Sequence, residues 1–305
     1  MAKTRSDTRA KLKTLQEQTR RGEEKAVAKQ HSEGKLTARE RIEKLLDPGT
    51  FVEEFMLAET PSLDFGMAER KRPTDGVVTG YGKIGNRTVY VFAQDFTVIA
   101  GTVGAAHAEK IAYCIERARK IRVPVIGLYD SAGARIQEGL DVTKAIGKIF
   151  FQNSIASGAV PQISAIMGPC IGVAAYSPAL TDFVIMVKGT SQMFITGPSV
   201  IKEVTGEDVS MEELGGARIH SEVSGVADAV ASSDEECLQQ IRKLLAFLPS
   251  SAFQEPPRSE PSDDPDRLIH DLENVVPEDP KKPYDVRAVI RRIADNDEFV
   301  ELKPK

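Results

Sequence analysis

The chain has 305 residues, of which 41% are hydrophobic and 28% charged, and its 40 Lys and Arg against 45 Asp and Glu give a net charge of −5. This composition is ordinary for a globular protein and excludes collagen-like and wholly disordered chains. The mildly acidic balance argues against general nucleic-acid binding, and the lack of an apolar run of about 18 residues argues against direct membrane insertion.

The N-terminus is too polar for a secretory signal, so we expect a protein of the reducing cytoplasm. Three cysteines, Cys114, Cys170 and Cys237, are spaced too widely for a disulfide framework or a zinc site. The four histidines lie in separate segments without the spacing of metal ligands, and we expect structural roles for them and no metal site.

Residues 1–45 predict a basic, helical segment with few apolar positions. Within it, Thr37 is followed three residues later by Glu40, which matches a capping box and predicts that a helix begins there. The run Asp47-Pro48-Gly49 should follow the end of that helix.

The pattern changes at Thr74, where DGVVTGYGKIGNRTVYVFAQDF predicts a strand, a Gly-Asn turn and a second strand. Helices and buried strands then alternate, and a final amphipathic helix closes the domain. The expected ranges are helix 104–121, strand 123–130, helix 137–156, strand 161–168, helix 172–180, strand 182–187 and helix 235–248. Such alternation indicates an α/β domain with a mostly parallel sheet, which we place at 46–248.

The C-terminal part repeats a pattern of the N-terminal part. Residues 249–283 are acidic and rich in proline, which predicts a linker. Beyond it, residues 285–303 align without gaps to 37–55, with identities at Arg39/Arg287, Ile42/Ile290, Asp47/Asp295, Phe51/Phe299, Val52/Val300 and Glu53/Glu301. This self-similarity predicts a duplication, with 284–305 as the start of a second domain that is truncated here or encoded separately. Two unrelated amphipathic helices, each followed by a strand, are the alternative.

A glycine motif at Gly80, Gly82 and Gly85 has the spacing of a dinucleotide fingerprint, but a turn and a strand follow it where a helix would be needed. We interpret these residues as hairpin glycines.

Three other glycine-rich segments, at 94–107, 129–139 and 167–178, each follow an apolar strand and precede a helix. Small residues there allow a ligand to approach the backbone, and the first N–H groups of a helix have no internal partner. Two such junctions can form an oxyanion hole. Tight packing of helix on sheet is the alternative for any one junction. Because no strong side-chain nucleophile or base is evident, three junctions together favour chemistry carried by backbone donors.

Several of these segments, DGVVTGYG, FAQDFTV, DSAGARIQEG, NSIASG, PQISAIMGPC and YSPALTDF, closely resemble the carboxyltransferase (β) subunits of biotin-dependent acyl-CoA carboxylases. That group includes propionyl-CoA carboxylase β and the related acyl-CoA decarboxylases. The resemblance runs from about Thr37 to Leu248 and implies a crotonase-like (ClpP/crotonase) spiral of ββα units with flanking helices. It also implies a second, biotin-facing domain after the first, acyl-CoA-binding one.

The resemblance assigns catalytic roles to backbone groups. The family motif P-C-A-G-G-A appears here as P-C-I-G-V-A, which marks Gly172 and Val173, the latter replacing a glycine while keeping its N–H. The family motif D-S-G-G-A-R appears here with one glycine lost, which marks Gly133 and Ala134. Residues expected to hold the CoA thioester are Arg70, Lys71, Arg72, Ala132 and Ile171, with the basic N-terminal helix as a further candidate for the phosphates. A solvated charged surface is the alternative for the basic residues.

The implied function is transfer of a carboxyl group between carboxybiotin and a short-chain, propionyl-CoA-like acyl-CoA, through a thioester enolate that backbone N–H groups stabilise. Biotin would arrive on a separate carrier. The implied partners are acyl-CoA, biotin carboxyl carrier protein, biotin carboxylase and a separately encoded second carboxyltransferase half, within a homo- or hetero-oligomer.

Three alternatives remain open at this point. The first is a biotin-dependent decarboxylase of the methylmalonyl- or glutaconyl-CoA type, which uses the same site. The second is a non-catalytic acyl-CoA-binding or assembly subunit. The third is a hydratase or hydrolase, which needs a carboxylate base, and Asp130, Glu138 and Asp141 are the nearby candidates.

Overall fold

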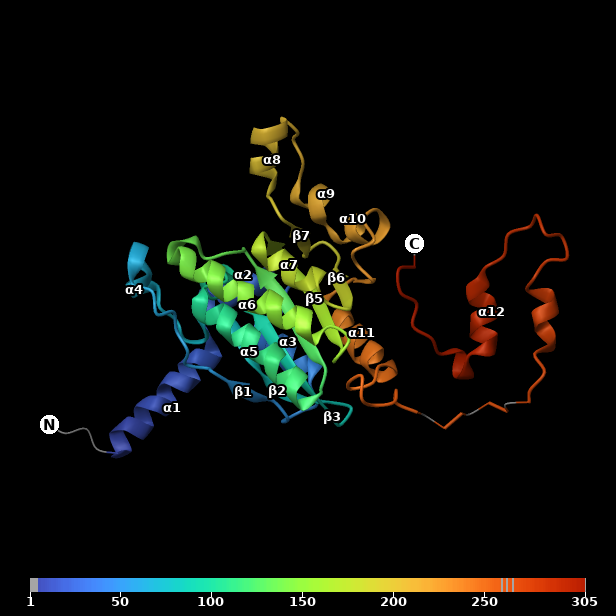
Figure 1. Cartoon of the computed structure of the whole chain (residues 1–305), viewed down its shortest axis with the longest axis horizontal. Helices are drawn as coiled ribbons and strands as arrows, with labels where there is room; N and C mark the ends of the chain where they lie inside the picture. Colours follow the sequence, from blue (N-terminus) through green and yellow to red (C-terminus); the bar gives the residue numbers. More distant parts are fainter. Residues whose placement is uncertain (1–4, 259, 262, 265, 305) are drawn as a thin grey trace.

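The computed structural model describes residues 5–258, 260–261, 263–264 and 266–304. Its centre is an eight-stranded sheet of order β1-β2-β3-β4-β5-β6-β8, with β7 paired to the end of β5 (Figure 1). The strands are β1 (Val52–Glu54), β2 (Val77–Ile84), β3 (Arg87–Gln94), β4 (Val125–Ser131), β5 (Gln162–Ile171), β6 (Phe183–Val187), β7 (Gln192–Phe194) and β8 (Ala229–Ala231). The pairs β1–β2 and β2–β3 are antiparallel and all others are parallel. The predicted α/β class with a mostly parallel sheet is confirmed.

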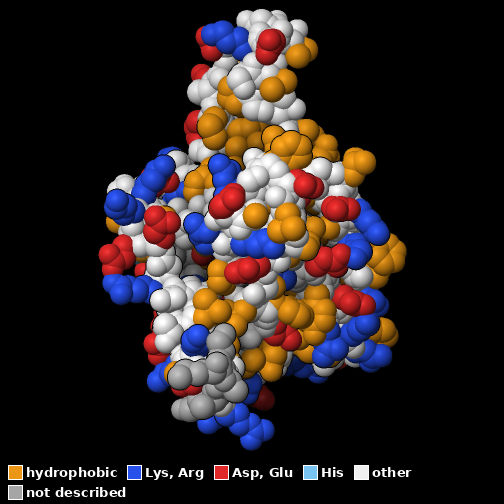
Figure 2. Space-filling model, turned by 90° about the vertical axis from the view of Figure 1, so that its left-hand side faces the viewer, with side chains coloured by type: hydrophobic (Ala, Val, Ile, Leu, Met, Phe, Trp, Pro, Cys, Tyr) orange, Lys and Arg blue, Asp and Glu red, His pale blue; other side chains and the backbone are white. Residues whose placement is uncertain are grey.

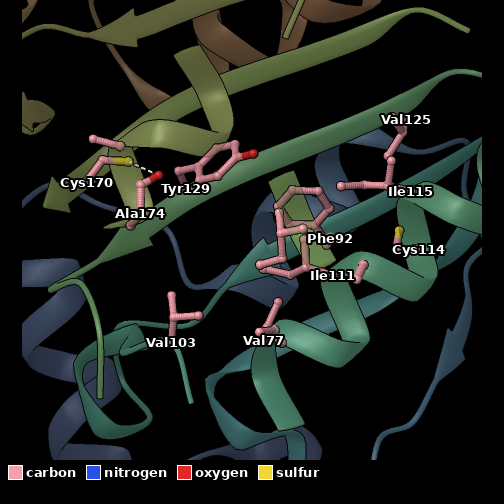
Figure 3. Packing of buried hydrophobic residues seen from close by; sticks show 14 of the residues in the cluster. Val77, Phe92, Val103, Ile111, Cys114, Ile115, Val125, Tyr129, Cys170 and Ala174 are labelled. Carbon is pink, nitrogen blue, oxygen red and sulfur yellow. Dashed lines mark hydrogen bonds between the residues drawn. The ribbon is translucent and has the colours of Figure 1, made fainter. Parts of the chain in front are cut away.

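Helices cover both faces of this sheet (Figure 1). Those of the body are α1 (Arg5–Arg21), α2 (Glu24–Ser32), α3 (Ala38–Leu45), α4 (Met67–Arg70), α5 (Ala105–Ile121), α6 (Leu140–Ala156), α7 (Val173–Ala179), α8 (Pro198–Thr205), α9 (Met211–Gly215), α10 (Ala217–Glu222) and α11 (Asp234–Phe247); α12 (Val286–Ile293) follows near the C-terminus. Buried side chains of α5, α6 and α7 form one hydrophobic cluster, and those of α3 and α11 form another on the opposite face. Figure 3 shows part of the first cluster, where Phe92 of β3 lies beside Ile111 of α5 and Tyr129 of β4 lies near Cys170 and Ala174.

Local sequence explains several boundaries. Thr37 and Glu40 form the predicted capping box at the start of α3. Gly85 and Asn86 both have positive φ, at 56° and 65°, as the tight turn between β2 and β3 requires. Gly80 lies in β2, where an added Cβ would be 2.1 Å from the carbonyl oxygen of Val52 on β1. The interpretation of this motif as hairpin glycines is therefore confirmed.

The strand β5 continues three residues past its expected end at 168, because β7 pairs with Pro169, Cys170 and Ile171. Sequence analysis did not identify β7 as a strand. It has three residues, which is too short for a period-two pattern to be visible.

The chain beyond α11 leaves the body and returns to it (Figure 1). The described residues of 249–283 contain no α-helix and no strand. Near the C-terminus, Val300 packs against the α3–α11 cluster, and the Lys303 N–H donates to the Asp228 carbonyl at 2.7 Å. The division into domains and a linker stays a prediction.

None of the helices in the part of the chain described above combines the length with the apolar character that a bilayer crossing needs.

Candidate functional site

Two of the predicted junctions lie side by side at the carboxyl ends of β4 and β5. Ser131 at the end of β4 is the register partner of Cys170 in β5. A Cβ added to Gly133 would lie 2.8 Å from the carbonyl oxygen of Ile171, so the two chain segments touch through their backbones. Carboxyl ends of parallel strands are where open α/β sheets bind ligands.

Two of the four expected backbone donors have acceptors within the protein. The Gly172 N–H donates to the carbonyl oxygen of Phe194 at 2.9 Å, and the Gly133 N–H donates to Ser131 Oγ at 3.1 Å. Neither N–H is therefore free to face a substrate in this structure. Gly172 instead shapes the turn as the residue before α7, with φ 60° and ψ −125°.

The other two predicted positions keep open donors. Val173 is the first residue of α7, so its N–H has no intrahelical acceptor. Ala134 forms an isolated bridge with Val103 that uses the Gly133 carbonyl and the Arg135 N–H and leaves the Ala134 N–H unused. Among the described residues, neither the Val173 nor the Ala134 N–H has a hydrogen-bond partner. Two donors from adjacent junctions can bind one developing negative charge.

The junction at 94–107 supports the junction at 129–139 through backbone hydrogen bonds. The Ala132 N–H donates to the Ala100 carbonyl at 3.0 Å, and the Val103 N–H donates to the Gly133 carbonyl at 2.8 Å. Ile99 and Ala100 have φ of 50° and 51°, which is strained for residues with a Cβ. Strain of this kind next to open backbone donors is typical of functional sites. Sequence analysis assigned this junction the same role as the other two, whereas the structure uses it as a support.

Arg135 is buried and faces inward. It forms ion pairs with Asp75 and with Glu138, the latter at 2.9 Å, and donates to the Thr102 carbonyl at 2.7 Å. Burial raises the pKa of Asp75, although Arg135 opposes that effect. Glu138 also accepts from Thr60 Oγ1 and from the Ala105 N–H, both at 2.7 Å. This cluster ties the start of α5 to the 131–135 junction.

The carboxylates that a hydratase or hydrolase would need are not available as bases. Glu138 is engaged as described above, and Asp130 is fully buried against Arg41 at 2.9 Å. Asp141 lies exposed in the first turn of α6. The geometry disfavours that alternative.

Two of the three basic candidates border a cavity of about 530 Å³. Arg70 and Arg72 line it together with the C-terminal end of α1 and the segment from Asp95 to Ile99, whereas Lys71 does not. Arg72 Nη1 donates to the backbone carbonyls of Glu69 and Lys71 at 3.2 and 2.9 Å. Ala132 is exposed and Ile171 half-buried at the two junctions. Val98 and Ile99 of the cavity wall are followed in the chain by Ala100, whose carbonyl accepts the Ala132 N–H. This hydrogen bond connects the cavity with the basic candidates to the 131–135 junction.

Comparison with known proteins places these features in a family. The family model for the carboxyl transferase domain matches residues 29–305. The chain is 53% identical over 278 residues to the carboxyltransferase subunit of propionyl-CoA carboxylase from Haloferax mediterranei, which covers 91% of this chain and 54% of that protein. It is 52% identical over 283 residues to the alpha subunit of methylmalonyl-CoA decarboxylase from Veillonella parvula, which covers 93% and 56%. The chain thus spans about half the length of the curated relatives it matches.

Among solved structures, transcarboxylase 12S with hydrolysed methylmalonyl-coenzyme A bound matches with a TM-score of 0.96 and 45% identity. The match covers 99% of this chain and 60% of that one, and that protein assembles as a hexamer. The predicted crotonase-like fold class is confirmed by this likeness.

Proposed function

Because the chain belongs to the carboxyl transferase domain family, we propose that it is the acyl-CoA-binding part of a biotin-dependent carboxyltransferase acting on a short-chain, propionyl-CoA-like thioester. The observation that carries the proposal is that the N–H groups of Val173 and Ala134, on adjacent junctions, have no hydrogen-bond partner among the residues that the structure describes. A thioester oxygen bound between them becomes more negative as the α-carbon loses its proton. Fixed donors stabilise that charge without reorganising, which is the largest single effect in many enzymes.

The remaining residues of the site orient the substrate. Gly172 forms the turn between β5 and the first residue of α7, and Val103 holds the 131–135 junction through two backbone hydrogen bonds. Arg70 and Arg72 provide positive charge for the CoA phosphates at the neighbouring cavity. We expect Lys71 to contribute less, because it does not line that cavity.

Biotin is proposed as the second reactant, on a separate carrier. When bound, carboxybiotin would supply the carboxyl group, and the ureido nitrogen that loses this group would accept the α-proton. Exposed Ala132 lies next to half-buried Ala134, so the open face of this junction can admit a second reactant. We assign no described residue to biotin, since the sequence resemblance places its site in a second domain. Biotin carboxylase and a biotin carboxyl carrier protein are the corresponding proposed partners.

The proposal is tested by infrared spectroscopy of propionyl-CoA that is isotope-labelled at its thioester carbonyl. Calorimetry first establishes binding to the purified chain, and the carbonyl stretch of the bound ligand should then move to lower frequency, because two N–H donors polarise it. Val173→Pro removes one donor at the first helical position, where proline is tolerated. We expect this variant to bind CoA but to lose most of the frequency change.

The matched control is Val173→Ala, which removes the branched side chain and keeps the N–H; it should retain the frequency change. In an assay completed with a second carboxyltransferase half and carboxylated biotin, Val173→Pro should lose about 100-fold or more in rate. Failure of the wild-type chain to bind propionyl-CoA would overturn the proposal.

A decarboxylase running the same transfer in reverse is the second candidate. It is favoured by the 52% identity to the Veillonella parvula subunit, which is close to the 53% identity to the carboxylase subunit. Both directions pass through the same enolate, so the donor test applies to both. Initial rates with methylmalonyl-CoA and biotin, compared with propionyl-CoA and carboxylated biotin, distinguish them.

Assembly into an oligomer is also proposed. Large apolar side chains are exposed on and before α8, namely Ile195 at 60%, Val200 at 49% and Val204 at 78%. Figure 2 shows hydrophobic side chains gathered around the base of the projection at the top of the molecule, in the region of α8 in Figure 1. Contiguous exposed apolar groups of this kind mark interaction sites. A second copy of the chain, or a second carboxyltransferase half, is the partner we expect there.

A further inference from the structure

The pairing of β4 with β5 contains an irregularity immediately before the two junctions. Tyr129 pairs with Ile166 and Ser131 pairs with Cys170, so Asp130 alone lies opposite Met167, Gly168 and Pro169. The extra residues of β5 form a bulge. Without it, Ser131 would face an earlier residue of β5, and the two junctions would not lie side by side. The bulge therefore sets the alignment of the Ala134 and Val173 donors.

The side chain of Asp130 fills this bulge. A Cβ added to Gly168 would lie 2.0 Å from Asp130 Oδ1, so the carboxylate occupies the space that a larger residue would take. Both Asp130 and Arg41 are fully buried. A buried carboxylate needs a partner to remain ionised, and a carbonyl turned out of a strand ladder needs a donor.

Arg41 of α3 supplies both. Its Nη1 donates to Asp130 Oδ2 at 2.9 Å, and its Nη2 donates to the Met167 carbonyl of the bulge at 3.0 Å. Its Nε donates to Asp234 Oδ2 at 2.8 Å, at the start of α11. One planar guanidinium thus joins the end of β4, the bulge of β5 and a helix on the same face.

Residues of the N-terminal segment balance the charges of the carboxylates Asp130 and Asp234. Gln30 Nε2 donates to Asp130 Oδ2 at 2.9 Å, and Lys35 Nζ lies 3.6 Å from the same oxygen. Asp234 Oδ2 also accepts the Leu36 N–H at 2.9 Å. Two cations and two carboxylates are buried together. Burial lowers the pKa of Arg41, but Asp130 and Asp234 outweigh burial and leave its pKa above the ordinary value.

We propose that Arg41 is a positioning residue for the thioester site: by holding Asp130 in the β5 bulge, it keeps the N–H groups of Ala134 and Val173 directed at one oxygen. Arg41 then supports the thioester site from α3, although its side chain does not touch the reacting atoms. This inference rests on the proposed function of those two donors.

The test uses the full chain and the labelled propionyl-CoA described above. Arg41→Gln removes the positive charge and the planar set of guanidinium donors. Arg41→Lys keeps the charge, but one ammonium group cannot reach Asp130, Asp234 and the Met167 carbonyl together. Both variants should still bind CoA, since Arg70 and Arg72 lie at a separate cavity. We expect both to lose most of the carbonyl frequency change. If Arg41→Gln does not fold, Arg41→Lys carries the test.

The matched control is Arg39→Gln, two residues away on α3. Arg39 also makes a two-pronged ion pair, with Glu53 at 2.8 and 2.9 Å, but it contacts neither strand end of the site. This variant should bind propionyl-CoA with the full frequency change. A merely structural role for Arg41 would lower stability in its variants and leave the carbonyl frequency of the folded fraction unchanged, and that result would overturn the inference.

Failure of the proposed function gives a different result. In that case the wild-type chain itself binds propionyl-CoA without a frequency change, or does not bind it. If the wild-type chain shows the frequency change and the Arg41 variants show it to the same extent, only the positioning role of Arg41 is overturned.

Discussion

The backbone N–H of Gly172 donates a 2.9 Å hydrogen bond to the carbonyl oxygen of Phe194. This bond extends the β5–β7 pairing to the residue that precedes α7. Gly172 has φ 60° and ψ −125° there, a conformation that side chains with a Cβ avoid. A proline at 172 would remove a bond within the protein, so it cannot serve as a test of substrate contact. An alanine tests the turn itself.

Gly172→Ala should lower the free energy of unfolding by about 1–3 kcal/mol through backbone strain. A steric clash does not cause this loss, because an added Cβ would lie 3.6 Å from the nearest atom, the Ile195 carbonyl oxygen. The strained turn should also re-aim the Val173 N–H, so the carbonyl frequency change of bound propionyl-CoA should shrink. Urea unfolding and infrared spectroscopy measure the two effects.

The control for this prediction is Gly206→Ala. Gly206 ends α8 with φ 80°, and an added Cβ would meet nothing within 4 Å. It should lower stability through the same kind of strain and leave the carbonyl signal unchanged. Equal carbonyl signals in both variants would contradict the role of the Gly172 turn.

Acid should destabilise the protein through His107. Burial holds the pKa of His107 well below the ordinary value, and the charge of Arg135 adds to this effect. Its neutral ring is satisfied, because Nδ1 donates to the Asp75 carbonyl at 3.0 Å and Nε2 accepts from Gln94 Nε2 at 3.2 Å. The unfolded chain takes up a proton near pH 6.5 and the folded chain does not. Stability is therefore lost as the pH falls below about 6.5.

His107→Asn removes this titration while keeping a donor near the Asp75 carbonyl. The variant should be less stable at neutral pH, and its free energy of unfolding should fall less steeply between about pH 6.5 and pH 5. Urea titrations at several pH values give the two slopes, with His270→Asn at an exposed residue as the control for the substitution. Parallel curves for wild type and His107→Asn would contradict the prediction.

Alkali should act in the opposite direction through Lys110. Burial lowers the pKa of Lys110 to about 8, and its Nζ donates to the Thr74 carbonyl at 2.8 Å and to the Val77 carbonyl. Between about pH 8 and pH 10.5 the unfolded chain binds a proton that the folded chain has lost, so this group adds stability as the pH rises. The gain is at most about 3 kcal/mol. Lys110→Met should abolish this rise of the free energy of unfolding with pH. The control is Lys120→Met, at an exposed lysine of the same helix, which should keep the rise. Equal pH slopes for the two variants would refute the prediction.

Patterns of local sequence were sufficient for the parts of the fold that local rules govern. The capping box at Thr37, the Gly85–Asn86 turn and the alternation of buried strands with helices each depend on neighbouring residues. The repeat at offset 248 now has a structural counterpart. Arg39 donates from Nη1 and Nη2 to the two carboxylate oxygens of Glu53, and Arg287 donates from Nε to both carboxylate oxygens of Glu301. Val52 lies in a strand, whereas Val300 does not, so residues 285–303 repeat the pairing of the same two residue types without the sheet pairing.

The sequence was sufficient to propose a candidate site, but it could not show which of the backbone donors are free. The sequence gives no reason to prefer Val173 over its neighbour Gly172 as a donor. Only the pairing of β5 with β7 shows that the Gly172 N–H already donates to the Phe194 carbonyl. Arg41 and Asp130 are 89 residues apart. Nothing local to α3 indicates that Arg41 bonds to Asp130 and to the β5 bulge, because burial and long-range pairing decide which partners meet.

The exposed face of α8 yields the last prediction. Val204 is 78% exposed although it is a large apolar residue, and Val200 and Ile195 lie exposed nearby. Burying such groups against a partner removes apolar surface from water, which favours association by about 25 cal/mol per Å². The chain should therefore self-associate, and Val204→Glu should shift it toward smaller species because a carboxylate would be buried in the contact. Sedimentation velocity over a range of concentrations measures the shift. Leu268→Glu, at a residue that is 77% exposed in the acidic segment, is the matched control and should leave the distribution unchanged. A chain that stays monomeric throughout, or a Val204→Glu profile equal to that of the control, would show that this face is not the contact between copies.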